Sequence, residues 1–304
     1  MRRGEFDIVH GGFLPHGVTL YAAGRIARRN RIPLVVTPCM HIGEPDDDRI
    51  LRRYTDPHQL ALLRDADLIC AFTRVEKETL ASFGVPAGRI SVMRGGISIE
   101  ELAGGSEDRF RRTHGVRGPV VLFLGTRGYD KGATHVVEAA GELWKAGRDF
   151  TLVLAGSASN RDFLAFFRSC RDDVKRRTLV LESVSDEEKR DLLDAAHLLA
   201  IPSRNESLGI AYLEAWACGK PVIGARAGAI REIIADGVDG FLVPFGRPAE
   251  LAERIGRLLD DPALARAMGE AGRAKLLAEG FTVERMTEEL ETAYLKVCAG
   301  AAAR

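Results

Sequence analysis

The chain has 304 residues, 46% of them hydrophobic and 28% charged, a composition typical of globular proteins that argues against disordered and fibrous classes. Its 43 basic residues equal its 43 acidic residues, so no long-range field draws the whole molecule to nucleic acid. The length predicts two domains. Five widely spaced cysteines without a CxxC pair indicate neither a disulfide framework nor a zinc site, and a cytoplasmic location is the expectation.

Short apolar runs alternate with amphipathic helical stretches along the chain, which is typical of βα units and parallel sheets. In the first part the pattern predicts strands over residues 7–10, 33–37, 67–72 and 89–93, with helices such as 19–29 and 73–83 between them. A stretch rich in glycine and charge then predicts a domain boundary near residue 112. In the second part the predicted strands are 120–125, 151–156, 178–181, 198–203, 221–224 and 240–244.

The predicted fold class is therefore α/β, with two doubly wound, Rossmann-like parallel sheets. Residues 113–284 supply enough strands for a complete domain of this kind. Residues 1–112 supply only four, so the N-terminal domain is expected to be incomplete.

The most informative segment is 201–224, IPSRNESLGIAYLEAWACGKPVIG, which predicts a strand, a polar loop, a helix and a further strand. Ligands bind beyond the carboxyl ends of parallel strands, so the loop 203–209 is a candidate site. Glu206 lies in this loop, Glu214 about one turn inside the helix, and the amides near Gly209 suit a phosphate. On spacing alone, a second interpretation carries equal weight: both glutamates merely stabilise the helix N-terminus.

A second glycine-rich turn follows a strand in LFLGTRGYDKGATHVVEAAGELWKAG, residues 122–147. Arg127 and Lys131 stand at or just before the predicted helix start, where a cation is disfavoured unless an anion is near. These side chains indicate a phosphate site, although for either one alone extension into solvent is the favoured alternative. The absence of a GxxxxGK[ST] pattern argues against a P-loop nucleotidase.

Residues 202–222 match the pattern PSxxEsxGxxxLEAxAxGxPV, and with Lys131-Gly132 and IREIIADGVDGFLV they resemble the retaining glycosyltransferases of the GT4 group, which have the GT-B fold. FTVERMTEELETAYLKV is similar to the family's last helix, so residues 285–304 are expected to return to the N-terminal domain. Family members normally have a strand and a Gly-rich turn before the segment that begins here at Asp7. The resemblance therefore implies that the start of the N-terminal domain is lacking.

The resemblance also assigns roles. Glu206 would bind hydroxyls of the transferred sugar, Glu214 the ribose, and Lys131 the charge that develops on the leaving diphosphate. The family's arginine falls at Thr126 here, so Arg127, one place later, is the weaker assignment. The implied donor-binding residues are Arg127, Lys131, Val184, Glu206, Ser207, Leu208, Gly209, Ile210 and Glu214, with Val184 near the base.

His41, after the apolar run PLVVTPCM, resembles the family's histidine near the reaction centre, although a histidine after such a strand is more often structural. The resemblance therefore implies three catalytic residues: His41, Lys131 and Glu206. No metal or other cofactor is expected. The acidic run 46–48 indicates a solvated loop rather than a metal site.

The implied activity is transfer of a hexose-type sugar from a UDP- or GDP-sugar to a hydroxyl of a glycan, lipid or small-molecule acceptor, with retention of configuration. Two alternatives stay open: a donor-binding module that needs a partner chain, and a sugar-nucleotide epimerase of the same fold. The basic stretch 19–31 could contact the inner face of a membrane, with an ordinary solvated helix face as the alternative. No nucleic-acid partner is expected.

Overall fold

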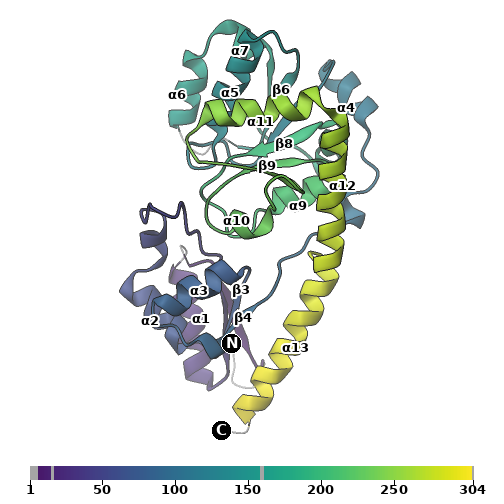
Figure 1. Cartoon of the computed structure of the whole chain (residues 1–304). Helices are drawn as coiled ribbons and strands as arrows, with labels where there is room; N and C mark the ends of the chain where they lie inside the picture. The colour runs from purple at the N-terminus through teal and green to yellow at the C-terminus, as the bar shows by residue number, and fades with distance from the viewer. Residues whose placement is uncertain (1–5, 15–16, 158–160, 303–304) are drawn as a thin grey trace. The chain divides into compact units, whose positions relative to one another are not determined.

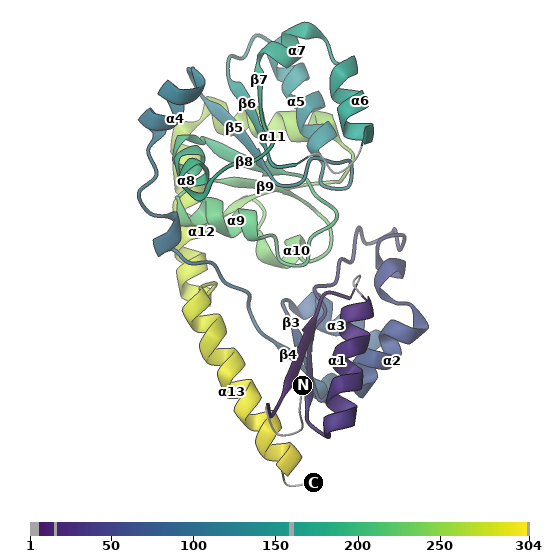
Figure 2. The same ribbon diagram turned by 180° about the vertical axis from the view of Figure 1, so that it is seen from behind.

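The computed structural model describes residues 6–14, 17–157 and 161–302. Contacts within the chain define two compact units. The first runs to Gly96 and includes Glu206–Leu208 and the chain from Gly280, whereas the second contains Ile97–Asn205 and Gly209–Glu279. Figures 1 and 2 show the elements of each unit from opposite sides.

The first unit is built on a parallel sheet in which the described strands follow the order β1-β2-β3-β4. The strands are β1 (Val9–Gly12), β2 (Leu34–Thr37), β3 (Leu68–Ala71) and β4 (Ile90–Val92). The helices are α1 (Gly17–Asn30), α2 (Pro57–Asp65), α3 (Arg74–Ser82) and α13 (Val283–Ala302), with short 3₁₀ turns η1 (Leu51–Tyr54) and η2 (Ala87–Arg89). In the register of this sheet Val35 lies opposite Leu68, and Ile69 opposite Ile90.

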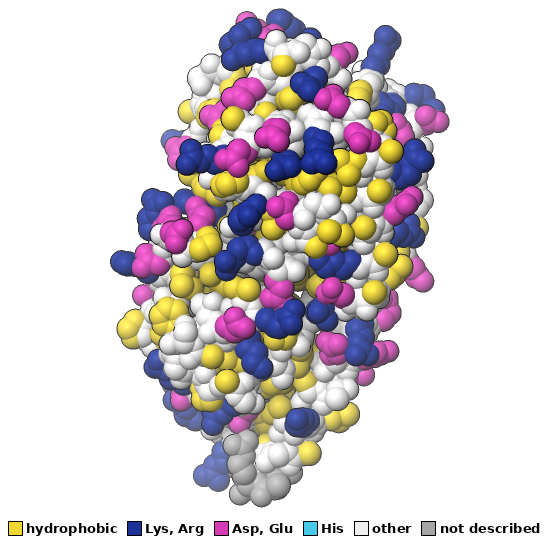
Figure 3. All heavy atoms as spheres, in the orientation of Figure 1, with side chains coloured by type: hydrophobic (Ala, Val, Ile, Leu, Met, Phe, Trp, Pro, Cys, Tyr) yellow, Lys and Arg dark blue, Asp and Glu magenta, His cyan; other side chains and the backbone are white. Residues whose placement is uncertain are grey.

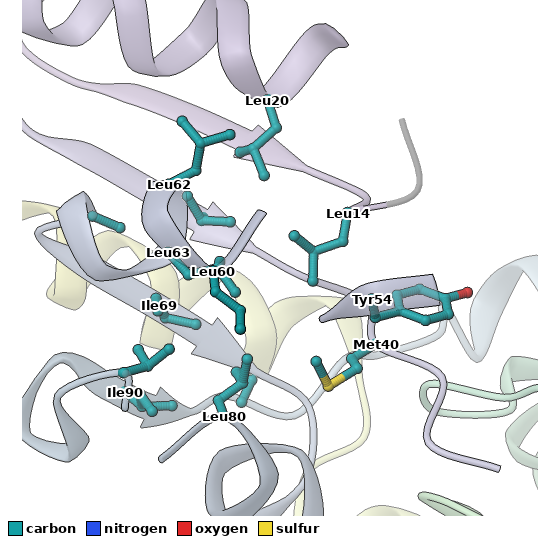
Figure 4. Packing of buried hydrophobic residues seen from close by; sticks show 14 of the residues in the cluster. Leu14, Leu20, Met40, Tyr54, Leu60, Leu62, Leu63, Ile69, Leu80 and Ile90 are labelled. Carbon is teal, nitrogen blue, oxygen red and sulfur yellow. The ribbon is translucent and has the colours of Figure 1, made fainter. Parts of the chain in front are cut away.

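The central strands of the first sheet, β2 and β3, are buried on both faces, as their continuous apolar character predicts. Successive residues of β3 face opposite ways, so Ile69 joins the main core with residues of α1, α2 and α3, whereas Cys70 joins a second cluster. Figure 4 shows the main core, with leucines from these helices meeting the sheet. Leu290 and Tyr294 of α13 pack on the second cluster, and Tyr294 also hydrogen-bonds His10 of β1.

The second unit is a larger parallel sheet with helices on both faces. Its strands are β5 (Val120–Leu124), β6 (Thr151–Ala155), β7 (Thr178–Leu181), β8 (Leu198–Ile201), β9 (Val222–Ala225) and β10 (Gly240–Val243). The α-helices are α4 (Glu107–His114), α5 (Ala133–Lys145), α6 (Arg161–Ser169), α7 (Asp172–Arg176), α8 (Asp186–Ala195), α9 (Ile210–Ala217), α10 (Ile230–Ile233), α11 (Pro248–Asp260) and α12 (Pro262–Glu279), after a 3₁₀ turn η3 (Glu100–Leu102).

The order of the strands in the second sheet is β10-β9-β8-β5-β6-β7 among the described residues. From β5 the chain proceeds to one edge through β6 and β7, then crosses back to β8 and proceeds to the other edge. The strand order therefore reverses between β5 and β8. In doubly wound sheets ligands bind beyond the carboxyl ends of the strands at such a point. The loops that follow β5 and β8, residues 125–132 and 202–209, lie there.

The structure confirms the α/β fold class with two parallel sheets, and every strand expected from the sequence is present. The first strand, β1, begins and ends two residues later than the expected range 7–10. The division between the units falls at Gly96, earlier in the chain than the boundary expected near residue 112. The reason is α4, which belongs to the second unit because Arg109 forms an ion pair with Asp191 of α8, 2.5 Å away.

Charges of both signs are mixed over the face drawn in Figure 3, in keeping with the equal numbers of basic and acidic residues. Among the helices that the structure describes, none is both long and apolar enough to cross a membrane.

Candidate functional site

The two loops at the switch point of the second sheet are joined through Lys131. This lysine stands directly before Gly132, the residue that caps the start of α5. Its Nζ donates a hydrogen bond to the backbone oxygen of Asn205, at 2.9 Å. Asn205 directly precedes Glu206 in the chain. The lysine expected to meet a phosphate and the loop that carries the glutamate expected to bind the sugar are therefore brought together, as a common ligand requires.

The start of α9 is shaped by Gly209, which caps the helix with a φ of +81°. A side chain here would be strained by this φ and would also collide with the Tyr212 ring, since its Cβ would lie 2.5 Å from that ring. Leu208 is buried before the glycine, and Ile210 is exposed after it. The first amides of a helix lack partners within that helix, so this turn is suited to an anion.

Glu214 lies one turn into α9, and its carboxylate is paired with a cation that the sequence did not reveal. Lys189 of α8 places its Nζ 2.9 Å from the Glu214 carboxylate. The side chains are 28% and 14% exposed, so the pair stands at a partly accessible place. Lys189 lies on α8, which β8 separates from α9 in the chain, and it belongs to no recognisable sequence motif. Only the structure, in which the Lys189 side chain of α8 meets Glu214 of α9, reveals it.

The structure places Arg127 differently from Lys131. Its side chain is only 1% exposed, its guanidinium lies over the Phe163 ring, and a terminal nitrogen is 3.4 Å from the Glu182 carboxylate. Glu182 directly follows β7, in the loop that also carries Val184. The arginine therefore connects the turn after β5 with the loop after β7 from inside the domain. Its direct contact with a donor, and that of Val184, stay predictions.

His41 belongs to the first unit, in the segment that follows β2. Its Nδ1 lies 2.6 Å from the hydroxyl of Tyr54 in η1. Burial raises the pKa of Tyr54 to about 12, so this phenol keeps its proton. In Figure 4 the ring of Tyr54 lies at the edge of the core and turns its hydroxyl away from the leucines. A histidine oriented by a buried tyrosine is held in one position, a feature that the sequence did not predict.

The backbone before His41 is fixed by a buried carboxylate. Glu76 of α3 is 1% exposed and accepts hydrogen bonds from the amides of Met40 and Phe72, at 2.9 and 2.8 Å. Burial raises the pKa of this carboxyl to about 7, and the two amide bonds oppose the rise. Glu76 thus ties the segment after β2 to the end of β3.

The acidic run 46–48 belongs to an exposed loop in which Asp47 pairs with Arg49 and Asp48 with Arg52. Within the described ranges, no group of three or more His, Cys, Asp or Glu side chains is arranged to hold a metal ion.

Comparison with known families gives two adjacent matches. The family model "Glycosyl transferases group 1" matches residues 106–275, and the model "Glycosyl transferase 4-like domain" matches residues 1–96. Among solved structures, Anabaena HepE in complex with UDP has a TM-score of 0.82 and 22% identity, covering 96% of this chain and 79% of its own. The sucrose-phosphate synthase of Thermosynechococcus elongatus has a TM-score of 0.81 and 21% identity, covering 97% and 74%. Both similarities show the GT-B fold.

Several curated relatives are named as glycosyltransferases. D-inositol 3-phosphate glycosyltransferase 1 of Catenulispora acidiphila is 30% identical over 319 residues, with 99% of this chain and 75% of the relative covered. Alpha-D-kanosaminyltransferase of Streptomyces kanamyceticus is 28% identical, with 82% of this chain covered. Alpha-maltose-1-phosphate synthase of Mycobacterium tuberculosis is 34% identical over 192 residues. The chain spans 66% of the length of the kanosaminyltransferase and 49% of that of the synthase. With more than half of its residues in the matched region, the chain belongs to the glycosyl transferases group 1 family, the GT4 group of the GT-B fold.

Proposed function

We propose that the chain transfers a hexose-type sugar from a nucleoside diphosphate sugar, with UDP or GDP as the nucleotide, to an acceptor hydroxyl. The observation that carries this proposal is the contact between the Lys131 ammonium and the backbone of Asn205, which joins the two loops of the switch point. The names of the relatives support it, and so do the complexes of Anabaena HepE with UDP and with UDP-glucose.

In this proposal the diphosphate is held without a metal ion. Lys131 supplies a full positive charge, and the first amides of α9 at Gly209 and Ile210 supply directed N–H groups. Charge builds on the diphosphate as the bond to the sugar breaks, so groups fixed in place before the reaction stabilise the transition state more than the ground state. The leaving phosphate then accepts the proton of the incoming hydroxyl on the same face of the sugar, which retains the configuration.

The proposed sugar contacts come from the two glutamates. Glu206 binds hydroxyls of the transferred sugar, and Glu214 binds the ribose while Lys189 fixes the orientation of its carboxylate. Backbone near Val184 meets the base. Carboxylates accept two hydrogen bonds from vicinal hydroxyls readily, which is the reason for assigning sugar contacts to them.

On the first unit we propose His41 as the residue that acts near the reaction centre. The Tyr54 hydroxyl keeps its proton and lies within hydrogen-bond distance of Nδ1 of His41. We propose that the hydroxyl donates this hydrogen bond, so that the ring proton of His41 stands on Nε2. In this tautomer Nε2 offers a hydrogen bond to a substrate oxygen.

Substitution of the two central residues tests the proposal. Lys131→Ala and Glu206→Ala should each lower kcat/KM for donor by about 100-fold or more, because each removes a contact made to the reacting group. The fold should survive, since both side chains are only partly buried, and circular dichroism checks this. Calorimetry measures the binding of UDP and GDP, and separate assays measure sugar transfer and donor hydrolysis. Unchanged turnover in both variants would contradict the assigned site, and nucleotide binding without transfer or hydrolysis would favour the donor-binding module.

We further propose that α1 contacts an anionic membrane, which would bring the enzyme to a lipid-linked acceptor. On the face of α1 away from the core, Val18 and Tyr21 are 85% and 56% exposed. Arg25 and Arg29 follow on exposed positions of the next turns, and Arg28 beside them forms an ion pair with Asp65. Apolar residues that enter the interface and arginines that meet lipid phosphates are the two components of peripheral binding by a helix.

Co-sedimentation with vesicles tests this contact. Wild-type protein should bind vesicles of phosphatidylcholine with phosphatidylglycerol, and bind pure phosphatidylcholine weakly. Arg25→Glu with Arg29→Glu should abolish the preference for the anionic vesicles, because the charge attraction is reversed. Equal binding of wild type and variant would show that α1 is an ordinary solvated helix.

A further inference from the structure

The loops after β5 and β8 are joined by an ion pair between Arg204 and Asp130, which no sequence motif predicted. Arg204, from the β8 loop, donates from Nε and Nη2 to one carboxylate oxygen of Asp130, from the β5 loop, at 3.0 and 2.8 Å. The arginine side chain is 12% exposed and the aspartate 33%, so the pair is largely shielded from water. Shielded pairs of this geometry restrict the groups that carry them more than exposed pairs do.

The backbones of the two loops are in contact as well. The Arg204 amide donates to the Asp130 backbone oxygen at 3.0 Å. At the next turn, a Cβ on Gly132 would lie 2.5 Å from the backbone oxygen of Pro202, so this close approach requires a glycine. The loops therefore cannot slide past each other without breaking the ion pair.

Aromatic rings determine the orientation of the Arg204 guanidinium. Its carbon lies 4.6 Å from the centre of the Phe245 ring and 5.7 Å from that of Tyr129. Phe245 follows β10, so a third loop takes part. His135, which lies on α5, contacts the rings of both Tyr129 and Phe245. A planar guanidinium stacks on rings and binds a carboxylate in a fixed orientation, which an ammonium does not.

The residues next to this pair are those of the proposed phosphate site. Lys131 follows Asp130, and Asn205, which accepts the hydrogen bond from Lys131, follows Arg204. We propose that Arg204 and Asp130 are positioning residues: their ion pair holds Lys131 in place for the diphosphate without touching the donor. This inference rests on the proposed function, in which Lys131 meets the diphosphate.

A double-mutant cycle with UDP as the probe tests the inference, with GDP measured in parallel. Arg204→Lys keeps the charge and removes the planar fork, so UDP affinity should fall by about tenfold, as for the loss of one well-placed charged contact. If Arg204 acts through Lys131, the same substitution in a Lys131→Ala background should change affinity by less than about twofold. Arg148→Lys is the matched control, because Arg148 also donates from Nε and Nη2 to a carboxylate, that of Asp260, in a more exposed ion pair away from these loops. It should leave UDP affinity unchanged.

The outcomes separate the two ideas. If Lys131→Ala weakens UDP binding but the effect of Arg204→Lys is the same in both backgrounds, the positioning role is wrong and the proposed function stands. If Lys131→Ala binds UDP and GDP as the wild type does, both are wrong. Thermal unfolding of each variant is measured alongside, and a variant that has lost its cooperative transition is replaced by Asp130→Asn, which removes the pair from the other side.

Discussion

At the scale of single residues, Glu76 shows how a buried charge can serve the segment beside it. Its carboxyl accepts the amides of Met40 and Phe72 in a nearly water-free place. Ionisation there is costly, and its pKa rises from 4.5 to about 7 for this reason. The sequence shows only a glutamate in the first turn of a helix, where acidic residues are common.

The raised pKa predicts a pH dependence of stability. Between pH 4.5 and about 7 the folded protein holds a proton on Glu76 that the unfolded chain has released, so the free energy of unfolding falls as pH rises through this range. The shift corresponds to about 3 kcal/mol. Glu76→Gln cannot titrate, so the difference in unfolding free energy between variant and wild type should change by about this amount between pH 4.5 and 8. Urea unfolding at several pH values measures it.

Glu78→Gln is the matched control for Glu76→Gln, since Glu78 is an exposed glutamate on the same helix. A constant difference between Glu76→Gln and wild type across the pH range would show that Glu76 does not titrate in the folded protein as described.

At the scale of elements, the loops after β5 and β8 depend on a glycine where two backbones meet. Gly132 has a φ of +78°, and its missing side chain leaves room for the Pro202 backbone oxygen. The sequence identified Lys131-Gly132 as a motif but not the reason for the glycine. The reason is a contact with a loop about seventy residues later in the chain, and no local pattern records it.

Two alanine substitutions separate backbone strain from this contact. Gly118 has a φ of +68° and nothing within 4 Å of its would-be Cβ, so Gly118→Ala should lower the free energy of unfolding by about 1 kcal/mol through strain alone. Gly132→Ala adds a collision with Pro202 and should cost about 2–4 kcal/mol, with weaker binding of UDP. Chemical denaturation measures the free energy of unfolding of each variant, and calorimetry measures its UDP binding. An equal loss of unfolding free energy in the two variants would mean that the two loops can move apart at Gly132 without destabilising the protein.

At the scale of the whole molecule, the alternation of apolar runs and helices was enough to predict both parallel sheets and their strands, because burial on both faces leaves a continuous apolar signature. The position of α4 was not predictable in this way. It depends on the ion pair of Arg109 with Asp191, whose partners are 82 residues apart in sequence.

The residues of the candidate site also fall into two groups, those predicted from a local sequence motif and those that depend on a distant partner. Lys131 and Glu206 lie in motifs of the β5 and β8 loops, and Glu214 lies in the part of the second motif that forms α9, so all three were predicted from these motifs. Lys189, Arg204 and Tyr54 were missed, since each acts through a partner on another element. The side chains expected to touch a ligand are thus visible in the sequence, whereas those that hold them in position are visible only in the structure.

The strand order also has a consequence for the growing polypeptide. Asp130 and Arg204 are 74 residues apart, and β6, β7 and their helices are synthesised between them. A nascent chain that has emerged only as far as β7 already carries Lys131, but lacks the carbonyl and the guanidinium that fix it. The arrangement proposed to hold the diphosphate is therefore completed only after β8 has been synthesised and has paired with β5.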